Sequence, residues 1–254
     1  MSEQLNAYEN RPLYGKKILV PYIEGFEYSY TDGIVAKEEH RLKVLLREEG
    51  AIVDVVKVGR IRPKSFAVSF DGTKKNWIVF TSANGIYAFM HNLKEQGMDV
   101  RNLFGCKIAV VGEKTAAVLE KFSLSADFIP KVHTAEALFK ELKTVVEEDA
   151  EITYFGAKDS AVLPGNVKPV VAYENEPVDV AEITESYDFV CFTSASGVSR
   201  LLPFLKDSSA NMISTGPSCS KALQSFEIRN FEESEEASYE GMVQKILGII
   251  KKVY

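Results

Sequence analysis

The chain of 254 residues is 46% hydrophobic and 26% charged with a net charge of −6, a composition typical of one large or two ordinary globular domains. It contains no cluster of Lys and Arg that would favour nucleic acid, and no apolar run long enough to span a bilayer. The polar N-terminus lacks a secretory signal pattern and the three cysteines form no CxxC pair, so we expect a cytoplasmic protein that contacts neither nucleic acid nor membrane.

Short β-branched runs alternate with helical stretches of about 10–15 residues, which predicts α/β units around a parallel sheet. The elements expected over the first two thirds of the chain are, in order, strand 16–23, helix 33–50, strands 51–58 and 77–80, strand-to-helix unit 106–122, helix 132–148, strand 151–157 and extended segment 168–177. Thr134 is a candidate N-cap of the helix expected at 132–148.

A second series of elements echoes the first. The sequence FTSANGI at residues 80–86 returns as FTSASGV at 192–198, an offset of 112 residues. Two further pairs align at a common offset of 104 residues, Gly112 with Gly216 and Thr134 with Ser238. Three matches in the same order predict two related α/β domains. The acidic stretch NFEESEEAS, which precedes the last match, is expected to be exposed loop.

The copies divide the chain unevenly, because a strand–helix–strand unit precedes the first copy and none follows the second. Assigning this leading unit to the second copy gives a discontinuous domain of residues 1–56 plus 174–254 and an inserted domain of 57–173. The chain then crosses between the domains twice, through linkers near 55–63 and 168–177. Two crossings predict a hinged cleft, a common place for a ligand site.

The turns that lead from strand to helix are the candidate binding residues. In parallel α/β sheets ligands bind beyond the carboxyl ends of the strands, and a helix N-terminus attracts carboxylate or phosphate. Four such turns carry hydroxyl, amide, ammonium or small residues: Thr81, Ser82, Ala83 and Asn84; Lys114 and Thr115; Thr193, Ser194, Ala195, Ser196 and Gly197; Gly216, Pro217 and Ser218. Ordinary N-capping also explains each turn alone, whereas the paired set favours a ligand with several negative charges.

Conventional catalytic motifs are missing from the sequence, which has no P-loop, GxSxG, HExxH or GxGxxG pattern. The three histidines, His40, His91 and His133, are scattered, so we expect solvated surface positions and no metal site. Cys191 lies within a strand and is expected to be an inert core thiol. Cys219 lies near a helix N-terminus, but its counterpart in the repeat is Thr115, which favours a small cap over a nucleophile.

Tyr173 is the one candidate for acid catalysis. It lies in the second predicted crossing, where a phenol can donate a hydrogen bond or a proton toward a ligand. A tyrosine that simply packs the hinge explains the same position equally well, so the residues alone leave both roles open.

Five motifs in this order resemble the uroporphyrinogen-III synthase family: FTSANGI, VVGEKTAAVL, VAYENEP, FTSASGV and TGPSCSKAL. The resemblance runs from about residue 16 to 250 and implies two flavodoxin-like parallel-sheet domains joined by two extended linkers. It implies a lyase of haem biosynthesis that cyclises hydroxymethylbilane, a linear tetrapyrrole with eight carboxylates, and inverts ring D. It also implies that no cofactor takes part, that Tyr173 is the candidate acid, and that Thr115 and Ser218 match hydroxyl positions at the family's turns.

The resemblance has two departures. The first strand of the family usually ends in Thr-Arg, whereas this chain reads ILVPYIEGFEYSY, and the segment 157–168 is too short for the usual helix. A non-catalytic tetrapyrrole- or polyanion-binding protein of the same fold is therefore an alternative, and a two-domain solute receptor is a weaker one. We expect a monomer, and the family chemistry leaves room for a transient contact with hydroxymethylbilane synthase.

Overall fold

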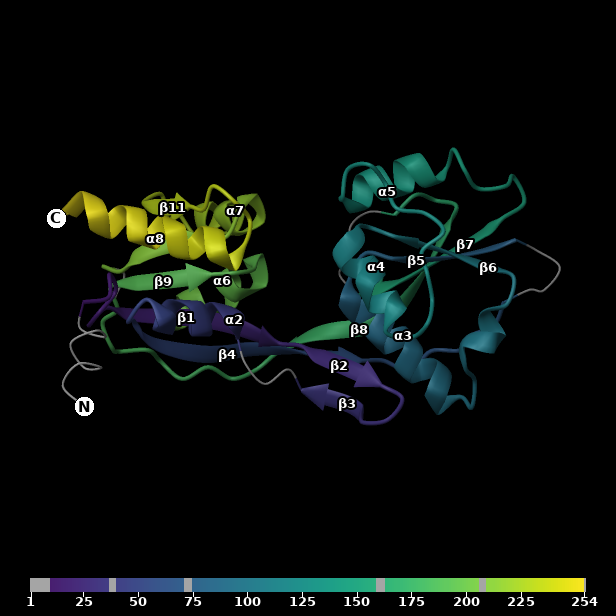
Figure 1. Cartoon of the computed structure of the whole chain (residues 1–254), viewed down its shortest axis with the longest axis horizontal. Helices are drawn as coiled ribbons and strands as arrows, with labels where there is room; N and C mark the ends of the chain where they lie inside the picture. Colours follow the sequence, from purple (N-terminus) through teal and green to yellow (C-terminus); the bar gives the residue numbers. More distant parts are fainter. Residues whose placement is uncertain (1–9, 37–39, 71–74, 159–162, 206–208, 254) are drawn as a thin grey trace. The chain divides into compact units, whose positions relative to one another are not determined.

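The computed structural model describes residues 10–36, 40–70, 75–158, 163–205 and 209–253, and it divides the chain into two compact units (Figure 1). Unit 1 contains residues 1–24, 37–60 and 177–254, and unit 2 contains 25–36 and 61–176. Both are α/β units with parallel strands.

Unit 1 has parallel strands in the order β11-β10-β9-β1-β4. Its strands are β1 (Lys17–Glu24), the first part of β4 (Ile52–Pro63), β9 (Phe189–Phe192), β10 (Asn211–Ser214) and β11 (Phe231–Glu233). Its helices are α2 (Arg41–Glu48), α6 (Ala195–Leu201), η2 (Leu202–Phe204), α7 (Pro217–Ser225) and α8 (Tyr239–Val253). The N-terminal strand β1 pairs with β9, so the two ends of the chain build one sheet.

Unit 2 has parallel strands in the order β8-β7-β5-β6. They are β5 (Asn76–Phe80), β6 (Cys106–Val110), β7 (Glu151–Ala157) and β8 (Val167–Pro177). The helices are α3 (Ala83–Glu95), η1 (Val100–Leu103), α4 (Glu113–Glu120) and α5 (Ala135–Leu142), and a hairpin of β2 (Phe26–Ser29) and β3 (Gly33–Ala36) packs against α3.

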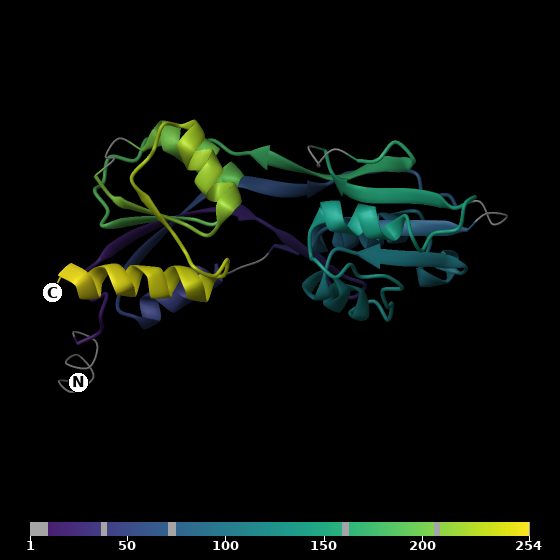
Figure 2. The same cartoon turned by 90° about the horizontal axis from the view of Figure 1, so that it is seen from above.

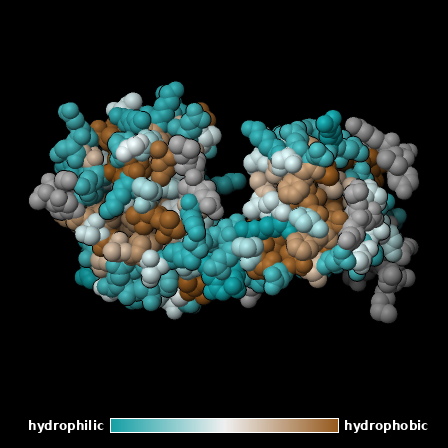
Figure 3. Space-filling view, turned by 180° about the vertical axis from the view of Figure 1, so that it is seen from behind, coloured by the Kyte–Doolittle hydropathy of each residue, from teal (hydrophilic) through white to brown (hydrophobic). Residues whose placement is uncertain are grey.

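Helices cover both faces of the sheet in each unit. In unit 1, α2 and α8 bury one face together with Ile18, Phe189 and Ile213, while α6 and α7 cover the other (Figure 2). In unit 2, α3 and α4 lie on one face and α5 on the other. On the face drawn in Figure 3, each unit has a hydrophobic area near its middle that is bordered by hydrophilic residues.

The two units share an irregularity as well as an order of strands. The register between β1 and β4 shifts after Tyr22, so that Ile23 lies opposite Gly59. The register between β7 and β8 shifts at the corresponding place, so that Ala157 lies opposite Tyr173. An irregularity at the same position in both copies agrees with the prediction that the two domains are related, since bulges are specific features of a strand pair.

Three segments differ from the sequence predictions. The helix expected at 33–50 is wrong in its first part: Gly33 has a positive φ of 70° and starts β3, because this stretch pairs with β2, and helix α2 begins at Arg41. The hairpin also belongs to unit 2, whereas the sequence assigned it to the other domain. The acidic stretch expected as loop contains the edge strand β11.

Most other elements agree with the predictions within a few residues, but α5 ends at Leu142, where the sequence predicts a helix that continues to 148. Thr134 caps α5 by accepting the N–H of Ala137. The described residues of the short segment 157–168 form no helix, and residues 159–162 lie outside the described part. Over the described residues, no helix is both long and apolar enough to cross a membrane.

Candidate functional site

The turn between β5 and α3 is built around two hydroxyl residues. Ser82 has extended backbone and caps α3, since its Oγ accepts the N–H of Gly85 at 3.2 Å. All four residues of the turn predicted from the sequence are partly exposed: Thr81, Ser82, Ala83 and Asn84. The turn is therefore accessible at the N-terminus of a 13-residue helix, where free N–H groups and a partial positive charge attract anions.

Tyr173 meets this turn from β8. Its hydroxyl lies 2.9 Å from Ser82 Oγ, and the side chain is 9% exposed. Burial raises the pKa of the Tyr173 phenol, the hydrogen bond with Ser82 acts in the opposite direction, and the nearby Tyr154 raises the pKa again. The phenol therefore stays protonated at neutral pH and can donate a hydrogen bond or a proton.

A second phenol meets the same turn from β7. The hydroxyl of Tyr154 lies 2.9 Å from Thr81 Oγ1, and the side chain is 4% exposed. Two consecutive hydroxyl residues thus each contact a buried tyrosine, one from the adjacent strand β7 and one from β8, the strand beyond it. The sequence prediction missed Tyr154, which reads as an ordinary apolar position of a buried strand; the glycine two residues later, Gly156, is the only local signal.

The equivalent turn of unit 1 has the same cap. Ser194 caps α6 by accepting the N–H of Gly197 at 3.0 Å, and its Oγ lies 3.4 Å from Ser196 Oγ. The residues predicted here are partly exposed except Gly197, which is buried: Thr193, Ser194, Ala195 and Ser196. Helix α6 has seven residues, about half the length of α3.

The turns that start α4 and α7 expose different residues from those expected. Thr115 is only 6% exposed and faces the core side of α4, so its hydroxyl is no part of an accessible turn. Lys114 is exposed in unit 2, and Pro217 and Ser218 are exposed in unit 1. Gly216 is buried. The repeat places Ser218 where unit 2 has Lys114, so the two copies present a hydroxyl and an ammonium at the same point.

A buried chain of hydroxyls supports the α7 turn from below. Ser214, fully buried at the end of β10, accepts the N–H of Gly216 at 3.2 Å and lies 2.7 Å from Ser220 Oγ. Ser220 in turn donates to the carboxylate of Glu233 on β11. This chain ties the turn to the edge strand of unit 1.

Cysteine and histidine chemistry finds no support at these turns. Cys191 and Cys219 are fully buried, and burial raises the pKa of the Cys219 thiol to about 11, which opposes a role as nucleophile. His133 is exposed as expected, whereas His40 and His91 are partly buried beside tyrosines. Within the described ranges no three His, Cys, Asp or Glu side chains lie close enough to hold a metal ion.

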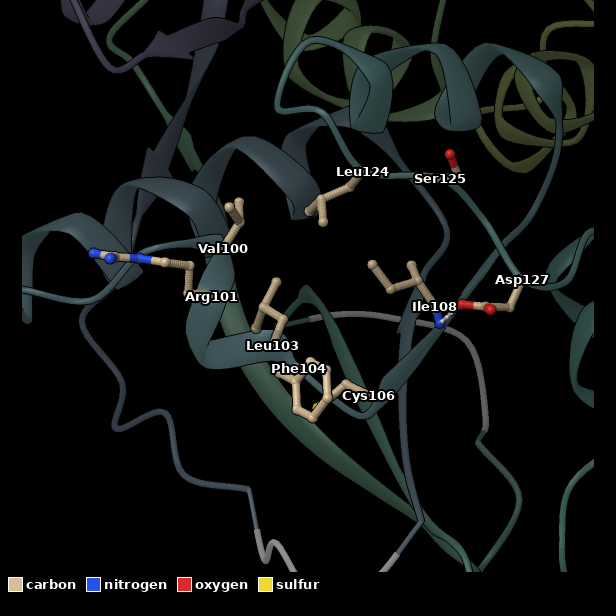
Figure 4. A pocket seen from close by; sticks show the side chains of 9 residues that line it. All are labelled: Val100, Arg101, Leu103, Phe104, Cys106, Ile108, Leu124, Ser125 and Asp127. Atoms are coloured by element: carbon tan, nitrogen blue, oxygen red, sulfur yellow. Dashed lines mark hydrogen bonds between the residues drawn. The ribbon is translucent and has the colours of Figure 1, made fainter.

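A pocket of about 520 Å³ lies beside β6 and η1 of unit 2 (Figure 4). Leu103, Phe104 and Ile108 contribute to its apolar lining, and Phe104 is 96% exposed. Its charged side chains are Arg101 and Asp127, and Asp127 accepts the N–H of Ile108 at 2.8 Å. None of the residues predicted for the site lines this pocket.

The chain is similar to proteins of tetrapyrrole synthesis. The family model of uroporphyrinogen-III synthase HemD matches residues 40–244. The porphyrin biosynthesis protein HemD of Ruminiclostridium josui is 24% identical over 98% of this chain and 51% of its own length, so the chain spans about half the length of that relative. A putative uroporphyrinogen-III synthase of Methanocaldococcus jannaschii is 28% identical over 59% of this chain and 70% of its own length.

Two solved structures share the fold. Uroporphyrinogen-III synthetase of Helicobacter pylori aligns with a TM-score of 0.59 at 19% identity, over 78% of this chain and 93% of its own. A mutant uroporphyrinogen III synthase of Thermus thermophilus aligns with a TM-score of 0.55 at 14% identity, over 94% and 100%. Since the family model covers parts of both units, including all four turns and Tyr173, the chain belongs to the uroporphyrinogen-III synthase HemD family.

Proposed function

We propose that the chain is a uroporphyrinogen-III synthase, which cyclises hydroxymethylbilane and inverts ring D. Membership of the family carries this proposal, because the matched region includes the turns and the phenol that the reaction needs. The accessible residues of the turns supply helix N–H groups, hydroxyls and one ammonium, which are suitable partners for the carboxylates of the substrate.

Tyr173 is the group we propose as the proton donor. The C–O bond of the hydroxymethyl group breaks as electrons from the pyrrole push out the oxygen, which takes the phenol proton and leaves as water. Loss of the pyrrole N–H proton then leaves a neutral azafulvene, and a proton from solvent restores the phenol. Ring D attacks the azafulvene methylene through its substituted carbon, the one by which it is already joined to the rest of the bilane. The product is a spiro intermediate, whose rearrangement inverts the ring.

Holding the bilane folded is the other task of the site. In free solution the azafulvene closes to the symmetric isomer I, so the protein must favour attack by the substituted carbon through orientation. The accessible turn residues are proposed to hold carboxylates for this purpose: Thr81, Ser82, Ala83, Asn84, Lys114, Thr193, Ser194, Ala195, Ser196, Pro217 and Ser218. Thr115, Gly197 and Gly216 are buried and support these turns from within.

The test is the isomer formed from freshly prepared hydroxymethylbilane. Purified protein is expected to shift the oxidised product from isomer I to isomer III. Unchanged isomer I, with a protein that is folded by circular dichroism and unfolds cooperatively, would refute the proposal. The assay is run with the chain alone, since a monomer without a partner enzyme is expected to suffice, and then with hydroxymethylbilane synthase to detect a transient contact.

One observation keeps a second candidate function open. The segment after β1, where the family usually has Thr-Arg, continues here into the hairpin of unit 2 and supplies no cation at that point. A non-catalytic tetrapyrrole-binding protein needs fewer such contacts than an enzyme. Tight binding of uroporphyrinogen III without any change of isomer would favour this alternative. Action in the cytoplasm stays a prediction from the sequence.

A further inference from the structure

The side chain of Tyr154 fits its position only because the residue two positions further on is glycine. Residues i and i+2 of a strand lie on the same face, and a side chain leans along the strand. The Tyr154 side chain lies over Gly156, where a Cβ atom would overlap the phenol hydroxyl. Glycine at this position therefore lets the hydroxyl reach Thr81 Oγ1, 2.9 Å away on the neighbouring strand's turn.

The two phenols of unit 2 hold consecutive residues. Thr81 contacts Tyr154 and Ser82 contacts Tyr173, each at 2.9 Å. The register shift after Gly156 brings Tyr173 opposite Ala157, so the same short stretch of β7 frees space for one phenol and sets the position of the other. Movement of Thr81 would therefore also move Ser82 relative to Tyr173.

Unit 1 shows that the fold does not require this arrangement. Thr153 pairs with Ile78 in unit 2, and Leu19 pairs with Val190 at the equivalent place in unit 1. Val20 therefore corresponds to Tyr154, and Tyr22 corresponds to Gly156. The turn of unit 1 forms and caps its helix without a phenol from this position.

We propose that Tyr154 is a positioning residue: through Thr81 it holds the β5–α3 turn in place beside Tyr173, so that unit 2 holds the reacting end of the tetrapyrrole. This inference rests on the proposed function. A looser turn lets the bound azafulvene close directly, so that isomer I is formed in place of isomer III.

The hydrogen bond is tested by a double-mutant cycle of Tyr154→Phe and Thr81→Val. Tyr154→Phe is expected to lower kcat/KM about fivefold, the effect of one lost hydrogen bond, and to raise the fraction of isomer I when protein is in excess over bilane. Thr81→Val is expected to lower kcat/KM at least as much, because its hydroxyl is also proposed to hold a carboxylate. The double variant is expected to lose no more than Thr81→Val alone, because Tyr154→Phe then has no contact left to remove. Thr81→Ser, which keeps the hydroxyl, is expected to retain the wild-type ratio of isomers.

Tyr87→Phe is the matched control. Tyr87 is also 4% exposed in unit 2, and its hydroxyl accepts a hydrogen bond from Lys121 at 2.9 Å. The control is expected to keep the wild-type kinetics and isomer ratio. Equal behaviour of Tyr154→Phe and Tyr87→Phe, or additive effects in the cycle, would overturn the inference.

Failure of the proposed function gives a different result. A wild-type chain that leaves isomer I unchanged refutes the synthase activity, and the same variants are then compared by calorimetric binding of uroporphyrinogen III. Weaker binding by Tyr154→Phe than by Tyr87→Phe supports the positioning role even then. Equal binding by these two variants, or no binding by the wild type, overturns it.

Discussion

The two repeated turns have the same backbone and differ in the residues behind them. In both, a threonine and a serine follow a buried strand, and the serine caps the helix through the N–H three residues later. In unit 2 buried phenols contact both hydroxyls, whereas in unit 1 the capping serine contacts Ser196 and valine replaces Tyr154. Gly59 lies opposite the bulge of unit 1 where Tyr173 lies in unit 2.

The features that the two turns share suit ligand binding, and the features found only in unit 2 suit a reaction. The part common to both copies, N–H groups beside hydroxyls, is what carboxylates need and says nothing about a reaction. The part found in one copy is a pair of buried phenols, of which Tyr173 has a raised pKa and suits proton donation. The two copies can therefore share a turn suited to carboxylates, while only unit 2 supplies phenols suited to proton donation.

Replacement of Tyr173 by Phe is expected to have the largest effect. If Tyr173 donates the proton, kcat for isomer III falls about 100-fold, the lower end of the contribution of a positioned acid. KM changes little, because the aromatic ring and the capping bond of Ser82 remain. The measurement is the initial rate of isomer III formation across a range of bilane concentrations. Equal losses in kcat and in product binding would leave Tyr173 a binding residue only.

The pH profile checks the same role by an independent route. The donor must be protonated, and burial raises its pKa above the ordinary value for tyrosine of about 10. Activity due to Tyr173 is therefore present at neutral pH and lost only as the pH rises through that raised pKa. Tyr173→Phe should abolish this alkaline limb, and Ser194→Ala in unit 1 should retain it.

Gly85→Ala in α3 and Gly197→Ala in α6 should change the free energy of unfolding in opposite directions. A Cβ at Gly85 would lie 2.7 Å from the carbonyl oxygen of Phe155, so helix and strand must separate, at a cost of about 2 kcal/mol. At Gly197 the nearest atom is Ser194 Oγ at 3.2 Å, which can move, and alanine favours the helix by about 1 kcal/mol. Urea unfolding measures both.

Trp77 is the only tryptophan and is buried in unit 2, so its fluorescence reports the unfolding of that unit in the Gly85→Ala variant. The unfolding of the Gly197→Ala variant is measured by circular dichroism. Equal destabilisation by both substitutions would contradict the view that α3 lies closer to its sheet than α6 does.

Local signals explain what the sequence could predict. Ser82, Ser194 and Thr134 were expected to begin helices, and each caps one through a bond to the third residue on. The repeat itself was visible because strand, turn and helix recur in one order. Such features depend on neighbours within a few residues, which the sequence displays directly.

Long-range contacts explain what the sequence did not predict. Residues 33–36 pair with β2, and that hairpin buries Phe26 and Tyr28 against unit 2, which overrides the local helical pattern. Tyr154 contacts Thr81, 73 residues away, so apart from Gly156 nothing near it in the sequence marks the phenol as polar. Thr115 faces the core although its neighbour Lys114 is exposed, and one position along a helix decides between these outcomes.

Breaking the hydrogen-bonded hydroxyls of unit 1 should lower the free energy of unfolding by less than Gly85→Ala does. Ser220→Ala removes the bonds to Ser214 and Glu233 and is expected to lower the free energy of unfolding by about 1 kcal/mol. The repeat places Ala116 at the same point of α4, where Ala116→Ser should give no gain because Val110 stands in place of Ser214. Equal unfolding midpoints for Ser220→Ala and wild type would show that the chain of bonds adds no stability.

Acid should destabilise unit 2 before unit 1, and Glu147 is one of the carboxylates responsible. Lys107 at 2.9 Å, together with Trp77, lowers the pKa of Glu147 to about 2, and the repeat places Lys251 at the corresponding point of unit 1. A lowered pKa means that the stabilisation is complete above the unfolded value of about 4.3 and is lost as the pH falls toward 2.

Glu147→Gln should therefore lower the stability of unit 2 slightly at pH 6 and flatten its pH dependence between about 4.3 and 2. The effect is small because both groups of the pair are partly exposed and salt screens them. Trp77 fluorescence in urea, at low and high salt, measures it in the unit that contains the pair. An unchanged slope in this pH range would place the acid sensitivity of unit 2 in other carboxylates, and the difference between the units would then not depend on this pair.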